Sequence, residues 1–128
     1  MIDKIFQKGR ETGLNDMEVY YSEGSSLSLK VFQKDLDGYS LSESEGLSLR
    51  GVYKGKMGYS YTEKVDETSI DQLVRDAAEN ALIIDSEDEE YIFEGSKEYK
   101  KVDSFNQTLS NVGEEQKINF VKSLEEEA

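Results

Sequence analysis

Two hydrophobic periodicities occupy different parts of this 128-residue chain, and they constrain its fold more than any other feature. Between residues 17 and 62, apolar side chains recur at every second position in short runs, as in strands that bury one face of a sheet. Between residues 70 and 82 they recur three and four positions apart, as on one face of a helix. A chain of this length is long enough for one hydrophobic core, so we expect an α+β domain.

The alternating pattern predicts about five antiparallel strands in a meander. Four runs show it most clearly, over residues 17–22, 27–32, 47–52 and 57–62. Turn-forming residues separate the runs at Gly24-Ser25, Asp35 to Gly38, Glu45-Gly46 and Lys54-Gly55.

Two helices are predicted to pack on this sheet. The first opens the chain, where Ile2, Ile5 and Phe6 share one helical face, and it is expected to end at Gly13. The second is amphipathic, and Thr68 followed by Asp71 resembles its capping box. Its apolar stripe consists of Ile70, Leu73, Val74, Ala77, Ala78, Ala81 and Leu82.

A third helix is predicted from Glu114 to Ala128, with Asn111 as its cap. Its inward face is expected to carry Ile118, Val121 and Leu124. The last turn has no capping signal, and three glutamates there oppose the helix dipole. We therefore expect residues 1–110 to form an N-terminal α+β scaffold and residues 111–128 to begin a helix, cut at the chain end, that leads to a downstream domain. Residues 85–112 are expected to be irregular.

The residue types that are missing exclude whole classes of site. The chain has no His and no Cys, so a zinc, haem or iron–sulfur site with the usual nitrogen and sulfur ligands cannot form within it. Ser–His–Asp and Cys–His catalysis are excluded for the same reason. We expect no catalytic residue, no cofactor-binding residue and no metal ligand in this chain. Disulfides are also impossible, which fits a reducing compartment such as the cytoplasm.

The charge argues against two classes of partner. Asp and Glu number 28 and Lys and Arg number 15, which gives a net charge of −13. This balance opposes binding to nucleic acid or to an anionic membrane surface, because both need positive charge against phosphate. No apolar run approaches the roughly 20 residues that a membrane span needs.

The acidic clusters can be interpreted as functional sites or as solvated surface side chains. The run Asp85-Ser86-Glu87-Asp88-Glu89-Glu90 suggests calcium, but Glu90 stands where an EF-hand loop needs Gly. A solvated acidic loop is therefore favoured over a cation site. Four further carboxylates offer a glycosidase-like acid and base, but their expected turn locations favour solvated side chains. They are Asp35, Asp37, Glu43 and Glu45.

The glycines and tyrosines of the strand region also allow more than one interpretation. Gly55-Lys56-Met57-Gly58 lacks the full spacing of a phosphate-binding loop and predicts a tight hairpin turn. The tyrosines fit packing on a sheet face, a stacking platform for nucleic acid, or a groove for peptide side chains. Because the net charge opposes nucleic acid, packing is favoured and the groove is the main alternative. These tyrosines are Tyr20, Tyr21, Tyr39, Tyr53, Tyr59 and Tyr61.

The order of short motifs along the chain resembles the N-terminal domain of the TldD/PmbA family, also called modulator of DNA gyrase. The resemblance covers nearly the whole chain, and it rests on the order and spacing of motifs that are weak one by one. The matching segments are Glu18-Val19-Tyr20, Ser25-Ser26-Leu27-Ser28, Ser42-Glu43-Ser44, Gly46-Leu47-Ser48-Leu49-Arg50, Gly55 to Thr62 and Glu114-Glu115-Gln116-Lys117-Ile118. The segment Met57 to Glu63 is more similar to the PmbA, or TldE-like, side of the family than to the TldD side.

The resemblance implies a function that the residues of this chain do not carry themselves. In the family, a zinc peptidase subunit with a His-Glu-x-x-x-His helix pairs with a sister subunit that lacks this motif, and the pair processes or degrades peptides in the cytoplasm. None of the metal-binding or catalytic residues maps onto positions 1–128. The chain is therefore expected to be a scaffold and assembly domain that works with a TldD-like partner subunit and unfolded peptide substrates. The alternative is a stand-alone acidic module for protein interaction.

Overall fold

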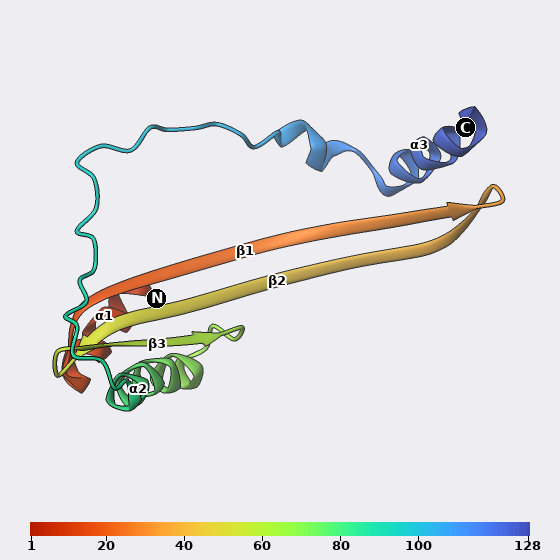
Figure 1. Ribbon diagram of the computed structural model, residues 1–128. Coiled ribbons are helices and arrows are strands. Elements are labelled where there is room, and N and C mark those ends of the chain that lie inside the picture. The colour runs from red at the N-terminus through yellow and green to blue at the C-terminus, as the bar shows by residue number, and fades with distance from the viewer. The chain divides into compact units, whose positions relative to one another are not determined.

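The computed structural model describes residues 1–128 and confirms an α+β fold with an N-terminal helix, an antiparallel sheet and a C-terminal helix (Figure 1). The elements are α1 (Ile2–Thr12), β1 (Leu14–Phe32), β2 (Asp35–Tyr53), β3 (Lys56–Thr62), α2 (Glu67–Ile83), the 3-10 helix η1 (Gln107–Asn111) and α3 (Glu114–Glu127). The strands lie in the order β1-β2-β3, so β2 is central and β1 and β3 are the edges. None of the helices combines the length and the apolarity that a membrane span requires.

The prediction of about five strands is wrong, because the sheet has three. The expected turns at Gly24-Ser25 and Glu45-Gly46 lie inside β1 and β2, and neither Gly24 nor Gly46 has a positive φ. Each of these strands is 19 residues long: β1 joins the predicted runs at residues 17–22 and 27–32, and β2 extends the run at residues 47–52 back to Asp35. Gly24, Ser25 and Glu45 are exposed on the long strands, whereas Gly46 is buried beneath the ring of Tyr61, so turn-forming residue types stand here in extended chain.

The two hairpin turns hold two residues each. Lys54 and Gly55 have φ values of 49° and 81°, and they form the turn expected at this position between β2 and β3. The turn between β1 and β2 lies at Gln33 and Lys34, with φ values of 51° and 68°, and not at Asp35 to Gly38 as expected. Two successive left-handed residues match the twist of a hairpin, and the strand pairing selects this site although neither residue is Gly.

The chain divides into two compact units. The first comprises residues 1–24 and 44–95, and the second comprises residues 25–43 and 96–128. β1 and β2 therefore contribute to both units. The predicted division at residue 110 stays a prediction.

The hydrophobic core of the first unit lies between its helices and one face of the sheet. It contains Ile5, Leu14, Leu47, Leu49, Ile70, Leu73, Val74, Ala77 and Ala78. α2 packs closely on β3, where the buried hydroxyl of Ser60 donates to the carbonyl oxygen of Leu73 at 2.6 Å. The predicted apolar stripe of α2 is confirmed except at Leu82, which is 58% exposed. Leu82 lies at the margin of that stripe, and Ala81 beside it fills the contact over the sheet.

The helix ends confirm one predicted cap and correct two others. Gly13 ends α1 in the left-handed conformation, as expected. α2 begins at Asp66, whose carboxylate accepts the Ser69 backbone N–H at 2.8 Å, so Thr68 is not its cap. α3 begins at Gly113, whose N–H donates to Oε1 of Gln116, whereas the expected cap, Asn111, belongs to η1. In α2 the Asp66 carboxylate satisfies a free N–H group of the first turn. In α3 the cap residue has no side chain, and Gln116 accepts only the N–H of Gly113 itself.

The cap of α2 should make stability depend on acid pH. The Ser69 backbone N–H holds the pKa of Asp66 below its ordinary value of 3.8. A carboxyl whose pKa is lower in the folded state stabilises the fold above the unfolded value and loses this contribution as the pH falls through the folded value. We expect Asp66→Ala to lower the Tm at pH 7. The difference from the wild type should shrink below about pH 4 in thermal melts followed by circular dichroism. A difference that stays constant down to pH 2 would contradict this role.

The second unit consists of the end of the β1–β2 hairpin, η1 and α3. Both ends of α3 bind the hairpin: the Tyr39 hydroxyl donates to Oε1 of Glu114 at 2.7 Å, and the Lys34 backbone N–H donates to Oε2 of Glu125 at 2.7 Å. No side chain of α3 is fully buried, and Leu124, expected to face inward, is 54% exposed. Residues 84–106 form no helix or strand, which confirms most of the expected irregular segment.

Candidate functional site

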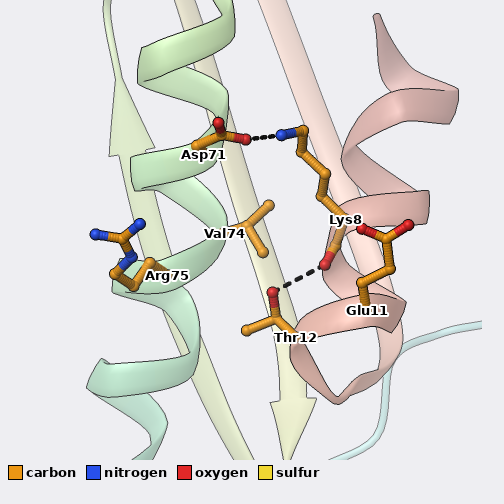
Figure 2. A pocket seen from close by; sticks show the side chains of 6 residues that line it. All are labelled: Lys8, Glu11, Thr12, Asp71, Val74 and Arg75. Carbon is orange, nitrogen blue, oxygen red and sulfur yellow. Dashed lines mark hydrogen bonds and ion pairs between the residues drawn. The ribbon is translucent and has the colours of Figure 1, made fainter.

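A cavity in the first unit lies between α1 and α2 (Figure 2). Its volume is about 190 Å³. Lys8 of α1 forms an ion pair with Asp71 of α2 across the opening, and the Thr12 hydroxyl donates to the Lys8 carbonyl at 2.9 Å. Glu11 and Arg75 complete the charged wall, so positive and negative groups are balanced. The volume is below the range of ligand pockets, roughly 300–1,000 Å³, and we interpret this cavity as a seam between the two helices.

A second ion pair supports the same arrangement of the helices. Lys4 of α1 pairs with Glu67 in the first turn of α2. Glu67 and Asp71 lie one turn apart on α2, and Lys4 and Lys8 lie one turn apart on α1. Two matched pairs in register fix how α1 lies against α2, which is a structural role. Exposed pairs of this kind stabilise a fold only slightly.

The carboxylates considered as an acid and base lie in the middle and at the start of β2, not in turns as expected. Asp37 pairs with Lys30 at 3.2 Å in the second unit, and Glu45 accepts from the Tyr21 hydroxyl at 3.5 Å in the first. All four of these carboxylates are exposed, and no buried side-chain nitrogen or oxygen of the structure lacks a hydrogen-bond partner. The structure gives these residues no arrangement suited to acid–base catalysis.

The acidic run at residues 85–90 follows α2 as irregular, largely exposed chain. The structure contains no group of three or more carboxylates that could hold a metal ion. With no His and no Cys in the chain, its residues do not fit a zinc site. The sequence predicted a solvated acidic loop over a cation site, and the exposure of this segment agrees with a loop.

The second unit contains an apolar groove of about 470 Å³ between the hairpin and α3. Leu27 and Leu29 of β1 form one wall, and Phe120 and Val121 of α3 form the other. Leu109 and Val112 close one end. The groove is large enough to hold apolar side chains. The sequence predicted an apolar face for each wall, in the alternating run at residues 27–32 and at Val121 of the third helix, but it did not predict that the two walls face one another.

The sheet of the first unit has one covered and one open face, and the tyrosines divide between them. Tyr21 and Tyr53 pack against the core, as the packing interpretation predicted. Tyr20, Tyr59 and Tyr61 are more than half exposed. These three lie outside the core on the open face of the sheet, where the ring of Tyr61 packs over Gly46 of β2.

The open face also carries an ion pair that sequence reasoning missed. The guanidinium of Arg50 forms a two-pronged pair with the carboxylate of Glu18, with Nε–Oε1 at 2.9 Å and Nη2–Oε2 at 3.0 Å. Arg50 lies directly opposite Tyr59 in the β2–β3 register. The two residues of the pair are 32 positions apart, so only the strand pairing brings them together.

The outer edge of β3 directs backbone groups away from β2. In a two-residue hairpin the closing pair, here Tyr53 and Lys56, is hydrogen-bonded, and every second pair after it is too. The residues between these pairs, Met57, Tyr59 and Tyr61, therefore direct N–H and C=O away from β2. The Asn80 side chain of α2 donates to the Tyr59 carbonyl at 2.8 Å, which agrees with this outward direction.

Three tyrosine hydroxyls bind carboxylates, and each contact has the same effect. Hydrogen bonds to Glu23, to Glu114 and to Glu89 raise the pKa of Tyr21, Tyr39 and Tyr91 respectively above the ordinary value of 10.0. At neutral pH these hydroxyls are protonated, and each donates its hydrogen bond to the carboxylate.

Comparison with known proteins assigns the family. Residues 17–81 match the model of PmbA/TldA metallopeptidase domain 1, which covers just over half of the chain from β1 to α2. The chain belongs to the PmbA/TldA family. This confirms the resemblance that the order of its strand motifs indicated. No curated protein matched the chain.

Two crystal structures share the fold of this PmbA/TldA domain. One is a candidate modulator of a DNA gyrase from Thermotoga maritima, with a TM-score of 0.78 and 21% identity over 94% of this chain. The other is TldE from Thermococcus kodakarensis, with a TM-score of 0.68 and 16% identity over 84% of this chain. The matched regions are 27% and 24% of those proteins, so the chain spans about a quarter of their length.

Proposed function

We propose that this chain is the N-terminal scaffold and assembly domain of a TldD/PmbA-like zinc peptidase system that processes or degrades peptides in the cytoplasm. The observation that supports this most strongly is the family match over residues 17–81. That segment holds most of the sheet and α2, but no His and no Cys. The domain would supply structure, and a TldD-like partner subunit would supply the zinc and the catalytic residues.

In such an assembly the metal would lower the pKa of a bound water and polarise the scissile carbonyl. This chain would contribute no group to that chemistry. Its part would be geometric: a rigid sheet backed by α1 and α2, and surfaces that hold a partner or an unfolded substrate. Its match to TldE supports the TldE-like, non-catalytic side of the family.

The proposal predicts where peptide cleavage occurs. We expect no hydrolysis of an unstructured peptide by the 128-residue chain, with or without added zinc, because it has no zinc ligands and no nucleophile–base pair. The longer polypeptide to which we assign this domain should also be inactive alone and should become active with a TldD-like partner. The measurement is cleavage of a fluorogenic unstructured peptide by these three samples.

Each other outcome has a distinct meaning. Cleavage by the chain alone would overturn the scaffold role. Cleavage by the longer polypeptide alone would assign it to the TldD-like catalytic side. The absence of cleavage in all three samples would favour the alternative, an acidic interaction module. Exposed aromatic side chains in the irregular segment, among them Tyr91, Phe93 and Phe105, are the feature that such a module would use.

A further inference from the structure

We propose that α3 is a releasable cover on the end of the β1–β2 hairpin. In the released state α3 leaves the hairpin while the first unit stays folded, and an apolar face of the hairpin becomes accessible. This device belongs to the second unit, residues 25–43 and 96–128, and it is independent of the function proposed above.

Burial distinguishes α3 from α2. α2 has six buried residues, whereas α3 has none. The apolar side chains of α3 stay partly open, and Phe120 and Leu124 are 63% and 54% exposed. Tertiary packing supplies most of the stability of a helix of this length, so a helix that buries so little opens at a lower free energy than the rest of the fold.

Two hydrogen bonds fasten α3 to the hairpin, one at each end of the helix. The Tyr39 hydroxyl donates to Oε1 of Glu114, and the Lys34 backbone N–H donates to Oε2 of Glu125, both at 2.7 Å. No ion pair joins α3 to the hairpin. Because water can replace a hydrogen bond between exposed groups, each of these bonds holds the helix only weakly.

The contact between the two fastened ends is incompletely packed. The groove of about 470 Å³ lies there, with Leu27 and Leu29 of β1 on one side and Phe120 and Val121 of α3 on the other. Apolar side chains that line an open groove keep part of their surface in water, so they gain only part of the stabilisation that full burial gives. The groove therefore lowers the free energy needed to lift α3 from the hairpin.

The hairpin face beneath α3 is apolar on both strands. Leu27 and Leu29 of β1 are half-buried there. On β2, Tyr39 reaches α3, and Leu41 lies on the same face because side chains two positions apart share a face. Residues 84–106 form no helix or strand, so α3 can leave without unwinding α2. Release therefore uncovers this face and leaves the first unit unchanged.

Hydrogen–deuterium exchange of the full 128-residue chain tests the release. A detached helix of this length is marginal in water, so the α3 amides exchange whenever α3 is off the hairpin. We expect them to exchange about a hundredfold faster than the amides of α2, which report opening of the first unit. Equal protection of the two helices would overturn the proposal, because α3 would then open only when the whole domain unfolds.

Glu125→Ala and Glu126→Ala are matched variants for one end of α3. Both remove a carboxylate from the last turn and introduce the same residue, but only Glu125 accepts the Lys34 backbone N–H. We expect Glu125→Ala to speed the exchange of α3 about two- to tenfold relative to Glu126→Ala, with no change in α2. Equal exchange of α3 in the two variants would overturn the proposal.

Tyr39→Phe and Tyr91→Phe form a second matched pair. Each removes one hydroxyl that donates to a glutamate, but Tyr39 binds Glu114 of α3 and Tyr91 binds Glu89 of the irregular segment. We expect only Tyr39→Phe to speed the exchange of α3, again about two- to tenfold. An equal response to both substitutions would contradict the attachment of α3 through Tyr39 and so the proposed cover.

Thiol labelling measures whether the hairpin face itself becomes accessible. The chain has no Cys, so Leu29→Cys introduces a single thiol beneath α3. Adding Glu125→Ala to this variant should speed its reaction with a thiol reagent about two- to tenfold, whereas adding Glu126→Ala should not. Ser28→Cys places the thiol on the opposite, exposed face, where neither addition should change the rate. Faster exchange of α3 without faster labelling of Leu29→Cys would mean that the helix frays while it stays on the hairpin, and it would overturn the release.

Discussion

Gly58→Ala is expected to destabilise the domain by about 3 kcal/mol or more. A Cβ at this position would lie 1.8 Å from the carbonyl oxygen of Ala77 and 2.8 Å from its carbonyl carbon. Both atoms belong to the backbone of α2, so no side chain can rotate to relieve the clash. The helix would have to move away from β3, and the core that it covers would open.

The matched control is Gly24→Ala, in β1. A Cβ there meets only Oγ of Ser44 at 3.9 Å, an ordinary contact, and Gly24 has no positive φ. We expect its free energy of unfolding to change by less than about 0.5 kcal/mol. Urea unfolding followed by circular dichroism measures both variants. If both variants changed the free energy of unfolding equally, α2 would not pack on β3 at Gly58.

Leu73→Ala is expected to lower the free energy of unfolding by about 3 kcal/mol, since it leaves a cavity in the core. Leu73 is 2% exposed and lies among the core residues that α2 directs toward the sheet. A typical domain has only about 5–15 kcal/mol of stability, so this loss should be plain in a urea melt.

Leu82→Ala makes the same chemical change on the same helix, but at a side chain that is 58% exposed. We expect it to cost less than about 1 kcal/mol, because little apolar surface is lost from the core. The comparison separates burial from helix propensity, which is the same for both substitutions. If Leu82→Ala were the more costly variant, the orientation of α2 would be wrong.

The candidate surfaces were only partly predictable. The sequence excluded a zinc site and nucleophilic catalysis of the Ser–His–Asp and Cys–His kinds, because those functions need residue types that are absent. It could not show that Arg50 meets Glu18, or that Asn80 reaches the Tyr59 carbonyl. These contacts join residues 32 and 21 positions apart, and local patterns contain no information about such pairings.

The sequence alone determined the kinds of element and their order. The spacing of apolar residues set the amphipathic face of α2, Gly13 ended α1, and Lys54-Gly55 set the turn before β3. These features depend on local backbone preferences and on the period of each element. The order of the strand motifs was also enough to identify the family.

Tertiary structure decided the number of strands and which residues are open to partners. The residue types around Gly24 and Gly46 predict turns, yet both glycines are extended within long strands. Strand pairing fixes their conformation, since the pairing partner satisfies the backbone hydrogen bonds that a turn would otherwise leave free. The same pairing makes β3 an edge, and its register with β2 decides which backbone groups face outward. That choice depends on contacts between residues distant in the chain, which no local pattern specifies.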